Sequence, residues 1–297
     1  MAIAILQLIR PKQWSKNLLV FAALLFTGDF RDTSLIIRAV AAFLAMCATS
    51  SAAYVLNDLL DADRDRAHPV KKNRPIASGR ISIPIAILVG VLLAAVGIGI
   101  ASWLGPGVLA LVGIYILIQV SYNAIWKRVP LSDVFMISAG FILRAVLGAA
   151  ALGVAISGWL LFCTGSLALM LGFGKRRHEY VLQGDERVKS REALAGYNLE
   201  TLNAFVVMCS VCAAQGYAMY AIQSPTAVKY PGLVVTTLFV FYGVFRYVYV
   251  VMRNGEGGEP ENLLFRDTHI LFTILCFIVT AILAIRGVHL KMIEGGH

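Results

Sequence analysis

The sequence predicts an all-α polytopic membrane protein, a bundle of about nine transmembrane helices forming one domain over residues 1–297. The chain is 59% hydrophobic and 14% charged, whereas a soluble domain is nearer half apolar and a quarter charged. Its apolar runs approach the roughly 20 residues that a helix needs to cross a bilayer. They also lack the weak, even alternation of a transmembrane β-barrel. A helical bundle is therefore the expected fold class.

Nine apolar segments are candidates for these helices, and the first of them is the shortest. The connections between them are unequal, because long polar stretches follow the second, sixth and eighth segments, whereas Gly105-Pro106 is only a turn. One membrane face should therefore carry most of the chain outside the bilayer. The nine segments are residues 15–28, 34–56, 83–104, 107–126, 132–153, 157–174, 200–222, 231–252 and 268–287.

Most lysines and arginines fall in the connections on that same face. Positive residues mark the cytoplasmic side of a membrane protein. This predicts a multi-pass protein of the inner (plasma) membrane, with the N-terminus and the long polar connections inside and the C-terminus outside. The N-terminal stretch has basic residues within its apolar pattern and no clear small-residue cleavage site, so we expect its helix to be retained.

The cysteines and the net charge argue against a cysteine-based metal site and against a nucleic-acid-binding site. The five cysteines all have apolar neighbours and no second Cys or His pair at metal spacing, which predicts buried packing residues. The net charge of +9 comes with no visible nucleic-acid module, so it indicates membrane topology and anionic ligands.

The densest charge cluster lies at residues 57–79. If its first part is helical, Asp58, Asp61 and Asp65 share one face with Asn57, whereas Asp63 points elsewhere and lies outside the site. Carboxylates on one stripe repel unless a cation joins them, and hard oxygen ligands suit Mg²⁺ bound to a substrate diphosphate. The predicted metal-binding and catalytic residues are Asn57, Asp58, Asp61 and Asp65.

Cations follow the acidic stripe within a short distance. Pro69 is predicted to end the helix, and Lys71 and Arg74 then lie where they could bind further phosphate groups of the same ligand. The alternative is an ordinary solvated loop between helices, which we consider less consistent with acids at helical spacing followed by a basic run.

Two further groups of cations are candidates for an anionic substrate. Lys175, Arg176 and Arg177 open a second polar stretch at residues 174–198, interpreted as a loop, where they suit an anionic co-substrate or simply mark the positive face. Arg144 lies within an apolar segment, where a guanidinium is costly unless it faces a cavity or a partner. Its alternative interpretation is an arginine that snorkels to the interface.

Five blocks together give a resemblance to a known family: RPKQWSKN at 10–17, AYVLNDLLDADRDRAHPVKKNRPIASG at 53–79, ILRAVLG at 142–148, GKRRHE at 174–179 and GEPE at 258–261. With these blocks the chain resembles the UbiA prenyltransferase superfamily, whose first acidic motif, Asn-Asp-x-x-Asp-x-x-x-Asp, begins here at Asn57. Within it, the chain is similar to the branch of decaprenyl-phosphate phosphoribosyltransferases. The resemblance implies a bundle of nine spans around a cavity open to the cytoplasm and the lipid. It also implies Mg²⁺-dependent transfer of 5-phosphoribose from phosphoribosyl diphosphate (PRPP) to a polyprenyl phosphate of decaprenyl type, for cell-wall arabinose donors.

One departure from the wider superfamily bears on the donor. Prenyl-diphosphate users carry a second acidic motif after the sixth span, and here Arg177 and Gly184 stand near its expected positions, with Asp185 close by. This disfavours a prenyl-diphosphate donor. The expected substrate-binding residues are Lys71 and Arg74 for the donor phosphates, Lys16, Arg144, Lys175 and Arg176 for the lipid phosphate or the 5-phosphate, and Tyr122 and Tyr197 near the ribose.

Two alternatives remain open from the sequence. The first is a UbiA-type prenyltransferase that moves a prenyl group from its diphosphate to an aromatic or quinone-precursor acceptor. The second belongs to another class, a transporter of an anionic lipid, which predicts broken helices in two related halves. No convincing internal repeat is visible, and the basic residues at 175–177 argue against the first.

Overall fold

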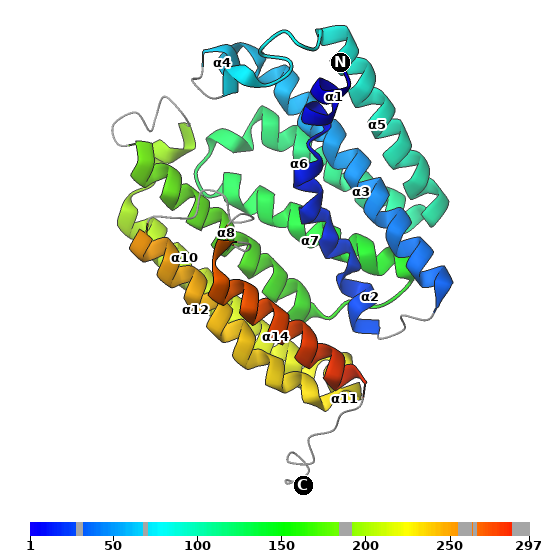
Figure 1. Ribbon diagram of the computed structural model, residues 1–297, viewed down its shortest axis with the longest axis vertical. Helices are drawn as coiled ribbons and strands as arrows, with labels where there is room; N and C mark the ends of the chain where they lie inside the picture. The colour runs from blue at the N-terminus through cyan, green and yellow to red at the C-terminus, as the bar shows by residue number, and fades with distance from the viewer. Residues whose placement is uncertain (28–31, 68–70, 184–191, 255–262, 264–265, 287–297) are drawn as a thin grey trace. The chain divides into compact units, whose positions relative to one another are not determined.

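The computed structural model describes residues 1–27, 32–67, 71–183, 192–254, 263 and 266–286, and these residues are helical apart from short connections (Figure 1). Among them, eight helices are long and apolar enough to cross a membrane. This confirms the all-helical polytopic fold. The spanning elements are α3 (Thr33–Leu60), α5 (Ile83–Leu104), α6 (Pro106–Ala124), α7 (Ser132–Leu152), α8 (Gly158–Gln183), α10 (Leu199–Gln223), η6 with α12 (Pro231–Val235 and Thr236–Asn254), and α14 (Thr268–Ile285).

The first predicted span, residues 15–28, is not a continuous helix of spanning length. The described part of the N-terminal segment consists of α1 (Ala2–Ile9), the 3₁₀ helix η1 (Pro11–Phe21) and α2 (Ala22–Thr27). Arg10, between α1 and η1, has a left-handed backbone with φ 52°. A residue before proline is disfavoured in the α region, and proline has no N–H to continue the helix, so α1 ends before Pro11. The expected nine spans are therefore eight among the described residues.

Local sequence signals explain where several helices begin. The Asp32 carboxylate accepts hydrogen bonds from the backbone N–H groups of Ser34 and Leu35 at the start of α3, and Asn198 caps α10 in the same way. These caps satisfy N–H groups that have no partner within the helix. Between α5 and α6, Gly105 adopts φ 132°, a conformation that favours glycine, and Pro106 opens the next helix. The predicted Gly105-Pro106 turn is confirmed.

The contacts divide the chain into two compact units. The first contains Met1–Trp126 and Leu143–Ala155, and the second contains Lys127–Ile142 and Ile156–His297. Helix α7 therefore contributes its first half to one unit and its second half to the other. The single domain over residues 1–297 stays a prediction.

In the first unit, α3 packs along α5, and α1 and η1 pack on α3 (Figure 1). Close approach depends on small residues, because a Cβ at Gly148 would lie 2.1 Å from the carbonyl oxygen of Val20. Near the N-terminus of α3, Arg38 binds two other helices. Its Nε donates to the Ala151 carbonyl at 2.6 Å and its Nη2 to the Leu104 carbonyl at 2.9 Å. This guanidinium thus binds carbonyl groups at two helix C-termini, which carry partial negative charge.

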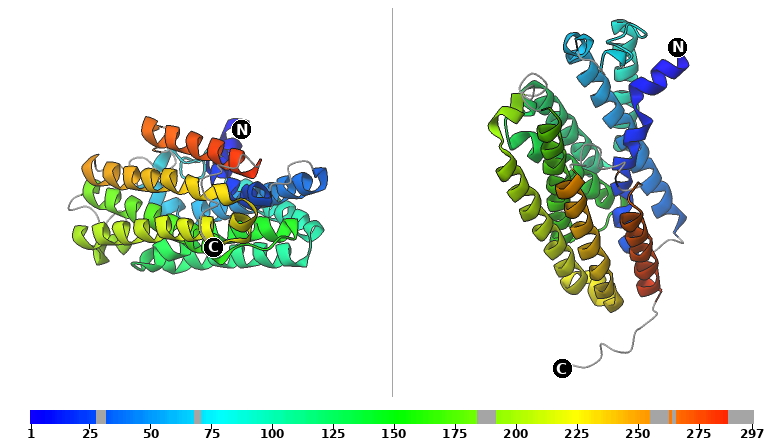
Figure 2. Two further views of the ribbon diagram at one scale, coloured as in Figure 1. Left: turned by 90° about the horizontal axis from the view of Figure 1, so that it is seen from below. Right: turned by 60° about the vertical axis from the view of Figure 1, so that its left-hand side comes forward.

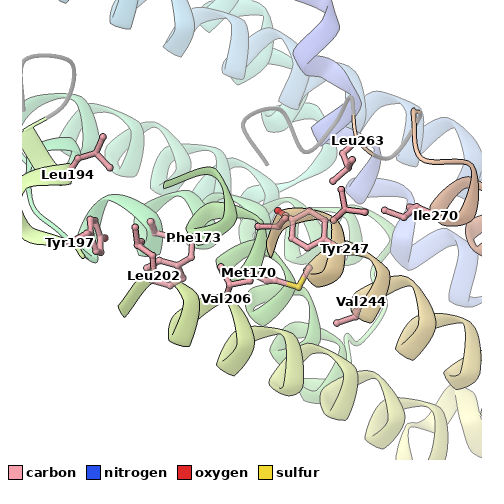
Figure 3. Close-up of a cluster of buried hydrophobic side chains, with 13 residues drawn as sticks. Met170, Phe173, Leu194, Tyr197, Leu202, Val206, Val244, Tyr247, Leu263 and Ile270 are labelled. Atoms are coloured by element: carbon pink, nitrogen blue, oxygen red, sulfur yellow. The ribbon is translucent and has the colours of Figure 1, made fainter. Parts of the chain in front are cut away.

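In the second unit, α8 lies along α10, and α12 packs on both α10 and α14 (Figure 2). Figure 3 shows the apolar core of this unit, in which Met170 and Phe173 of α8 lie among side chains of α10 and α12. Arg177 ties these helices together, since it donates to Asn203 and to the backbone carbonyls of Val251 and Met252 near the end of α12.

Candidate active site

The acidic stripe begins inside the last turn of α3, which contains Asn57 and Asp58, and this segment is helical as predicted. Asp61 lies between α3 and the short helix α4 (Ala62–Arg66). The Asp61 N–H donates to the Asn57 carbonyl at 3.0 Å, and the Asp65 N–H donates to the Asp61 carbonyl at 2.8 Å. These i to i−4 hydrogen bonds continue the helical hydrogen-bonding pattern across the junction. The backbone hydrogen bonding therefore stays helical from Asn57 to Asp65.

The two buried carboxylates of the stripe meet at one guanidinium. Asp58 and Asp65 are both buried. Nη1 of Arg74 lies 3.2 Å from Oδ1 of Asp58 and 2.6 Å from Oδ2 of Asp65. Nη2 of Arg10 lies 2.5 Å from the same Asp58 oxygen. Two carboxylates and two guanidinium groups thus form a compact, charge-balanced cluster.

The remaining members of the stripe differ in exposure. Asn57 and Asp61 are half-buried. The Asp63 side chain is 95% exposed and pairs with Arg66, three residues along the surface of α4. Asp63 thus points away from Asp58 and Asp65, as the helical spacing indicates. Pro69, predicted to end the helix, lies outside the described residues.

A cavity of about 660 Å³ opens beside Asp58. In the described part of the chain, its charged lining consists of one carboxylate, Asp58, and four cations, Arg10, Lys71, Arg74 and Arg80. A cavity with this excess of positive charge attracts polyanions, and several guanidinium groups at its wall suit phosphate oxygens.

The residues at this position fit Mg²⁺. Among the described residues, no group of three or more His, Cys, Asp or Glu side chains is arranged as a metal cage. Mg²⁺ commonly binds through one or two carboxylates together with substrate phosphates and water, so a full protein cage is not required. Asp58 and Asp65 already share one cationic atom, Nη1 of Arg74. These two hard oxygen donors, which face one cation, match the one or two carboxylates that Mg²⁺ takes from a protein.

A second polar cluster lies deep in the first unit around Arg144. Nε of Arg144 donates to Oδ1 of Asn17 at 2.7 Å, and Nη2 donates to the Tyr115 hydroxyl at 3.0 Å. Asn17 in turn donates to Ser50 and to Cys47 of α3. Arg144 is 5% exposed, so the alternative that it snorkels to the interface is wrong. The guanidinium instead joins α6, α7, η1 and α3.

The basic stretch of the second unit is helical, which corrects its interpretation as a loop. Helix α8 continues to Gln183, because no glycine or proline follows Gly174 until residue 184 and most of the residues between are good helix formers. Consecutive helical residues point about 100° apart, so the three cations have different environments. Lys175 is half-buried, whereas Arg176 and Arg177 are buried.

Arg176 and Tyr197 belong to one network with Asp133. Nε of Arg176 lies 2.8 Å from Asp133, and its Nη1 contacts Glu179. The Tyr197 hydroxyl donates to Asp133 at 3.1 Å and accepts from the Leu131 N–H. Burial first, and then the Asp133 carboxylate, raise the pKa of Tyr197 to about 12, so its proton stays in place at neutral pH. The other two candidates, Lys16 and Tyr122, are half-buried.

These environments predict different effects for Lys175 and Arg176. We expect Lys175→Ala to leave the folded protein intact and to raise the KM for the expected anionic co-substrate about tenfold, the effect of losing one charge-assisted contact of about 1.5 kcal/mol. Arg176→Ala should instead lower the thermal stability, because Asp133 loses its buried cation. Thermal unfolding in detergent and the KM for the co-substrate separate the two outcomes. Equal stability of both variants would contradict the structural role of Arg176.

The model of the UbiA prenyltransferase family matches residues 18–266 of the chain. The chain belongs to the UbiA prenyltransferase family. The protein is therefore a multi-pass membrane enzyme of a transferase family, and the stripe from Asn57 to Asp65 lies within the matched region.

Two UbiA relatives of this chain carry the same name, decaprenyl-phosphate phosphoribosyltransferase. The one from Corynebacterium glutamicum is 31% identical over 96% of this chain and 87% of its own length. The one from Mycolicibacterium smegmatis is 30% identical over 93% of this chain and 90% of its own length. A solved UbiA homologue from Archaeoglobus fulgidus, bound to DMAPP and Mg²⁺, has a TM-score of 0.72 at 19% identity and covers 95% of this chain and 99% of that one. This last similarity shows the shared fold.

Two residues of these clusters have no role predicted from the sequence. Arg10 lies in the block at 10–17 and contacts Asp58 from 48 positions away. Asp133 is an acid in the first turn of an apolar helix, and such a position indicates a polar partner. Arg177 stands near the expected second acidic motif and serves as a buried tie between helices, while Gly184 and Asp185 lie outside the described residues.

Proposed function

We propose that this UbiA-family enzyme transfers 5-phosphoribose from phosphoribosyl diphosphate to a polyprenyl phosphate of decaprenyl type and releases diphosphate. The observation that carries the proposal is the cavity beside Asp58, where four cations face one carboxylate. A donor with a diphosphate and a separate 5-phosphate needs more cations than a prenyl diphosphate does. The names of the two relatives, each about 30% identical over nearly the whole chain, support the same donor and acceptor.

The acidic stripe is the proposed metal site, formed by Asn57, Asp58, Asp61 and Asp65. Bound there, Mg²⁺ supplies charge neutralisation for the departing diphosphate. Lys71 and Arg74 are the proposed ligands of the donor phosphates, and the Archaeoglobus fulgidus homologue bound to DMAPP and Mg²⁺ supports a metal and a diphosphate together. Binding of both orients C1 of the ribose toward the acceptor.

The acceptor requires little activation by the protein. A polyprenyl phosphate is already an anion at neutral pH, so its oxygen can bond to C1 as the C1–diphosphate bond breaks, and no general base is needed. We assign Lys16 and Lys175 to the lipid phosphate or the 5-phosphate. Arg144 and Arg176 hold neighbouring side chains, so we assign them positioning roles. Tyr122 remains the proposed hydrogen-bond partner near the ribose, and Tyr197 supports Arg176 through Asp133.

The proposed orientation places the acidic stripe on the cytoplasmic side of the plasma membrane, because most lysines and arginines share its face. With eight spanning helices, an inside N-terminus and an outside C-terminus require that the segment Ala2–Thr27 also cross the membrane. Cysteine labelling from either side of sealed vesicles, at single cysteines placed near each terminus, tests this arrangement.

The donor assay tests the proposed function. Purified protein is incubated with Mg²⁺ and labelled phosphoribosyl diphosphate together with polyprenyl phosphates of several lengths, and in parallel with farnesyl diphosphate and an aromatic acid. We expect a ribosylated lipid in the first reaction, none after chelation of the metal, and no prenylated product in the second. A prenylated aromatic product without any ribosylated lipid would instead establish the aromatic prenyltransferase alternative. The match to a transferase family does not support the transporter alternative.

A further inference from the structure

One arginine holds both buried carboxylates of the acidic stripe. Nη1 of Arg74 is 3.2 Å from Asp58 and 2.6 Å from Asp65. These are two of the proposed metal ligands, and the guanidinium nitrogen lies where a cation common to both would lie. Arg10 adds a second positive charge at Asp58. The negative charge that would attract a metal ion is therefore already neutralised by the chain itself.

A metal ion and the guanidinium cannot both occupy this position. Like charges that share a site repel strongly where solvent is limited, and both carboxylates are buried. A divalent cation that binds the same two oxygens, Oδ1 of Asp58 and Oδ2 of Asp65, therefore displaces Arg74 from them.

The backbone of Arg74 is fixed, so only its side chain needs to move. Its N–H donates to the Lys71 carbonyl at 2.9 Å, and its own carbonyl accepts from Ser78 N at 2.9 Å and Ser78 Oγ at 2.8 Å. The side chain is 26% exposed and lines the cavity of about 660 Å³, together with Lys71 and Arg80. A displaced guanidinium therefore enters the cavity in which the donor phosphates are proposed to bind.

We propose that Arg74 is an exchangeable internal cation, bound to Asp58 and Asp65 in the metal-free protein and transferred to the phosphates of the donor when the metal binds. The inference rests on the proposed metal site. Metal binding alone is opposed, because it breaks two ion pairs and leaves a guanidinium without its carboxylates. Metal binding with a diphosphate is favoured, because the guanidinium gains a new anion. The exchange couples the two ligands, and a coupling of this kind is reciprocal.

The test measures metal affinity directly, without turnover. Mg²⁺ is titrated into the full-length protein by calorimetry, first alone and then in the presence of inorganic diphosphate. Arg74→Gln should bind Mg²⁺ alone about tenfold more tightly than the wild type, which lies within the usual range of coupling between sites. The same variant should gain much less from diphosphate than the wild type does. Arg10→Gln, which frees only Asp58, should show a smaller increase and provides a second measurement if Arg74→Gln does not fold.

Arg66→Gln is the matched control, because Arg66 lies in the same segment but pairs with exposed Asp63. It should bind Mg²⁺ as the wild type does, with and without diphosphate. An Mg²⁺ affinity of Arg74→Gln equal to or weaker than that of Arg66→Gln would overturn the exchange. Absence of Mg²⁺ binding in every variant, with diphosphate present, would overturn both the exchange and the metal site. Normal coupling in a protein that makes no ribosylated lipid would overturn only the proposed function.

Discussion

Replacing Asp58 by asparagine is expected to reduce turnover at least 100-fold while the protein remains folded. Asp58 is the carboxylate that lines the cavity and also contacts Arg10 and Arg74. Its loss removes a ligand from the proposed metal site, whose charge stabilisation is worth several kcal/mol, and each 1.36 kcal/mol is a factor of ten in rate. Asparagine keeps the shape and can still accept a hydrogen bond from either arginine. Initial rates of lipid ribosylation at saturating donor measure the effect.

Asp63→Asn is the matched control on the same segment. Asp63 is exposed and its pair with Arg66 lies at the surface, where ion pairs contribute about 0–1 kcal/mol. We expect nearly normal turnover. If Asp58→Asn and Asp63→Asn lose activity equally, the stripe is only a general source of negative charge and the one-face geometry does not form the site.

The contrast between these two aspartates was predictable because it depends on local geometry alone. The helical turn of about 100° per residue places Asp63 on a different face from Asp58 and Asp65, and the backbone hydrogen bonds across Asp61 continue that turn. The spanning helices were predictable for a similar reason, since long apolar runs can satisfy their backbone groups in lipid only as helices. Expected segments such as 83–104 and 200–222 agree with α5 and α10 within about a residue at each end.

Hydropathy could not predict the form of the N-terminal segment. Residues 15–28 are an apolar stretch, but the chain there forms the end of the 3₁₀ helix η1 and the short α2, and upstream of it the left-handed Arg10 before Pro11 separates α1. The prediction of a loop after Gly174 was wrong for a different reason. Their charge indicated a loop, yet α8 continues through them because Arg176 and Arg177 find buried partners on other helices.

Long-range pairs explain what else the sequence leaves undetermined. Arg10 and Asp58 are 48 positions apart, and Arg144 and Asn17 are 127 positions apart. No spacing rule connects such residues. Sequence reasoning correctly indicated that Arg144 needs a polar environment, but the identity of its partners follows only from the packing of η1 against α3 and α7.

The stability of the protein should depend on Asn17, because this residue is a hydrogen-bond partner of the buried Arg144. Asn17 is fully buried, accepts from Nε of Arg144, and donates to Ser50 and Cys47. Asn17→Leu keeps the number and branching of the side-chain heavy atoms but removes a charge-assisted hydrogen bond, worth about 1.5–3 kcal/mol, from a guanidinium that stays buried. It also leaves the Ser50 hydroxyl without the amide donor. We therefore expect a loss of about 3 kcal/mol of folding free energy, seen as a lower temperature of thermal unfolding in detergent.

The double variant Asn17→Leu with Arg144→Leu decides whether this loss comes from the buried charge. Removing the guanidinium ends the cost of burying it without the Asn17 acceptor, and apolar replacements of a buried polar pair can be as stable as the pair itself. The double variant should therefore be more stable than the sum of the two single losses predicts, with an interaction energy of about 1–3 kcal/mol. Arg144→Lys keeps the charge but lacks the fork that reaches both Asn17 and Tyr115, so it should be destabilised while the double variant recovers. Strictly additive losses would mean that Asn17 stabilises the fold through packing alone and that Arg144 does not depend on it.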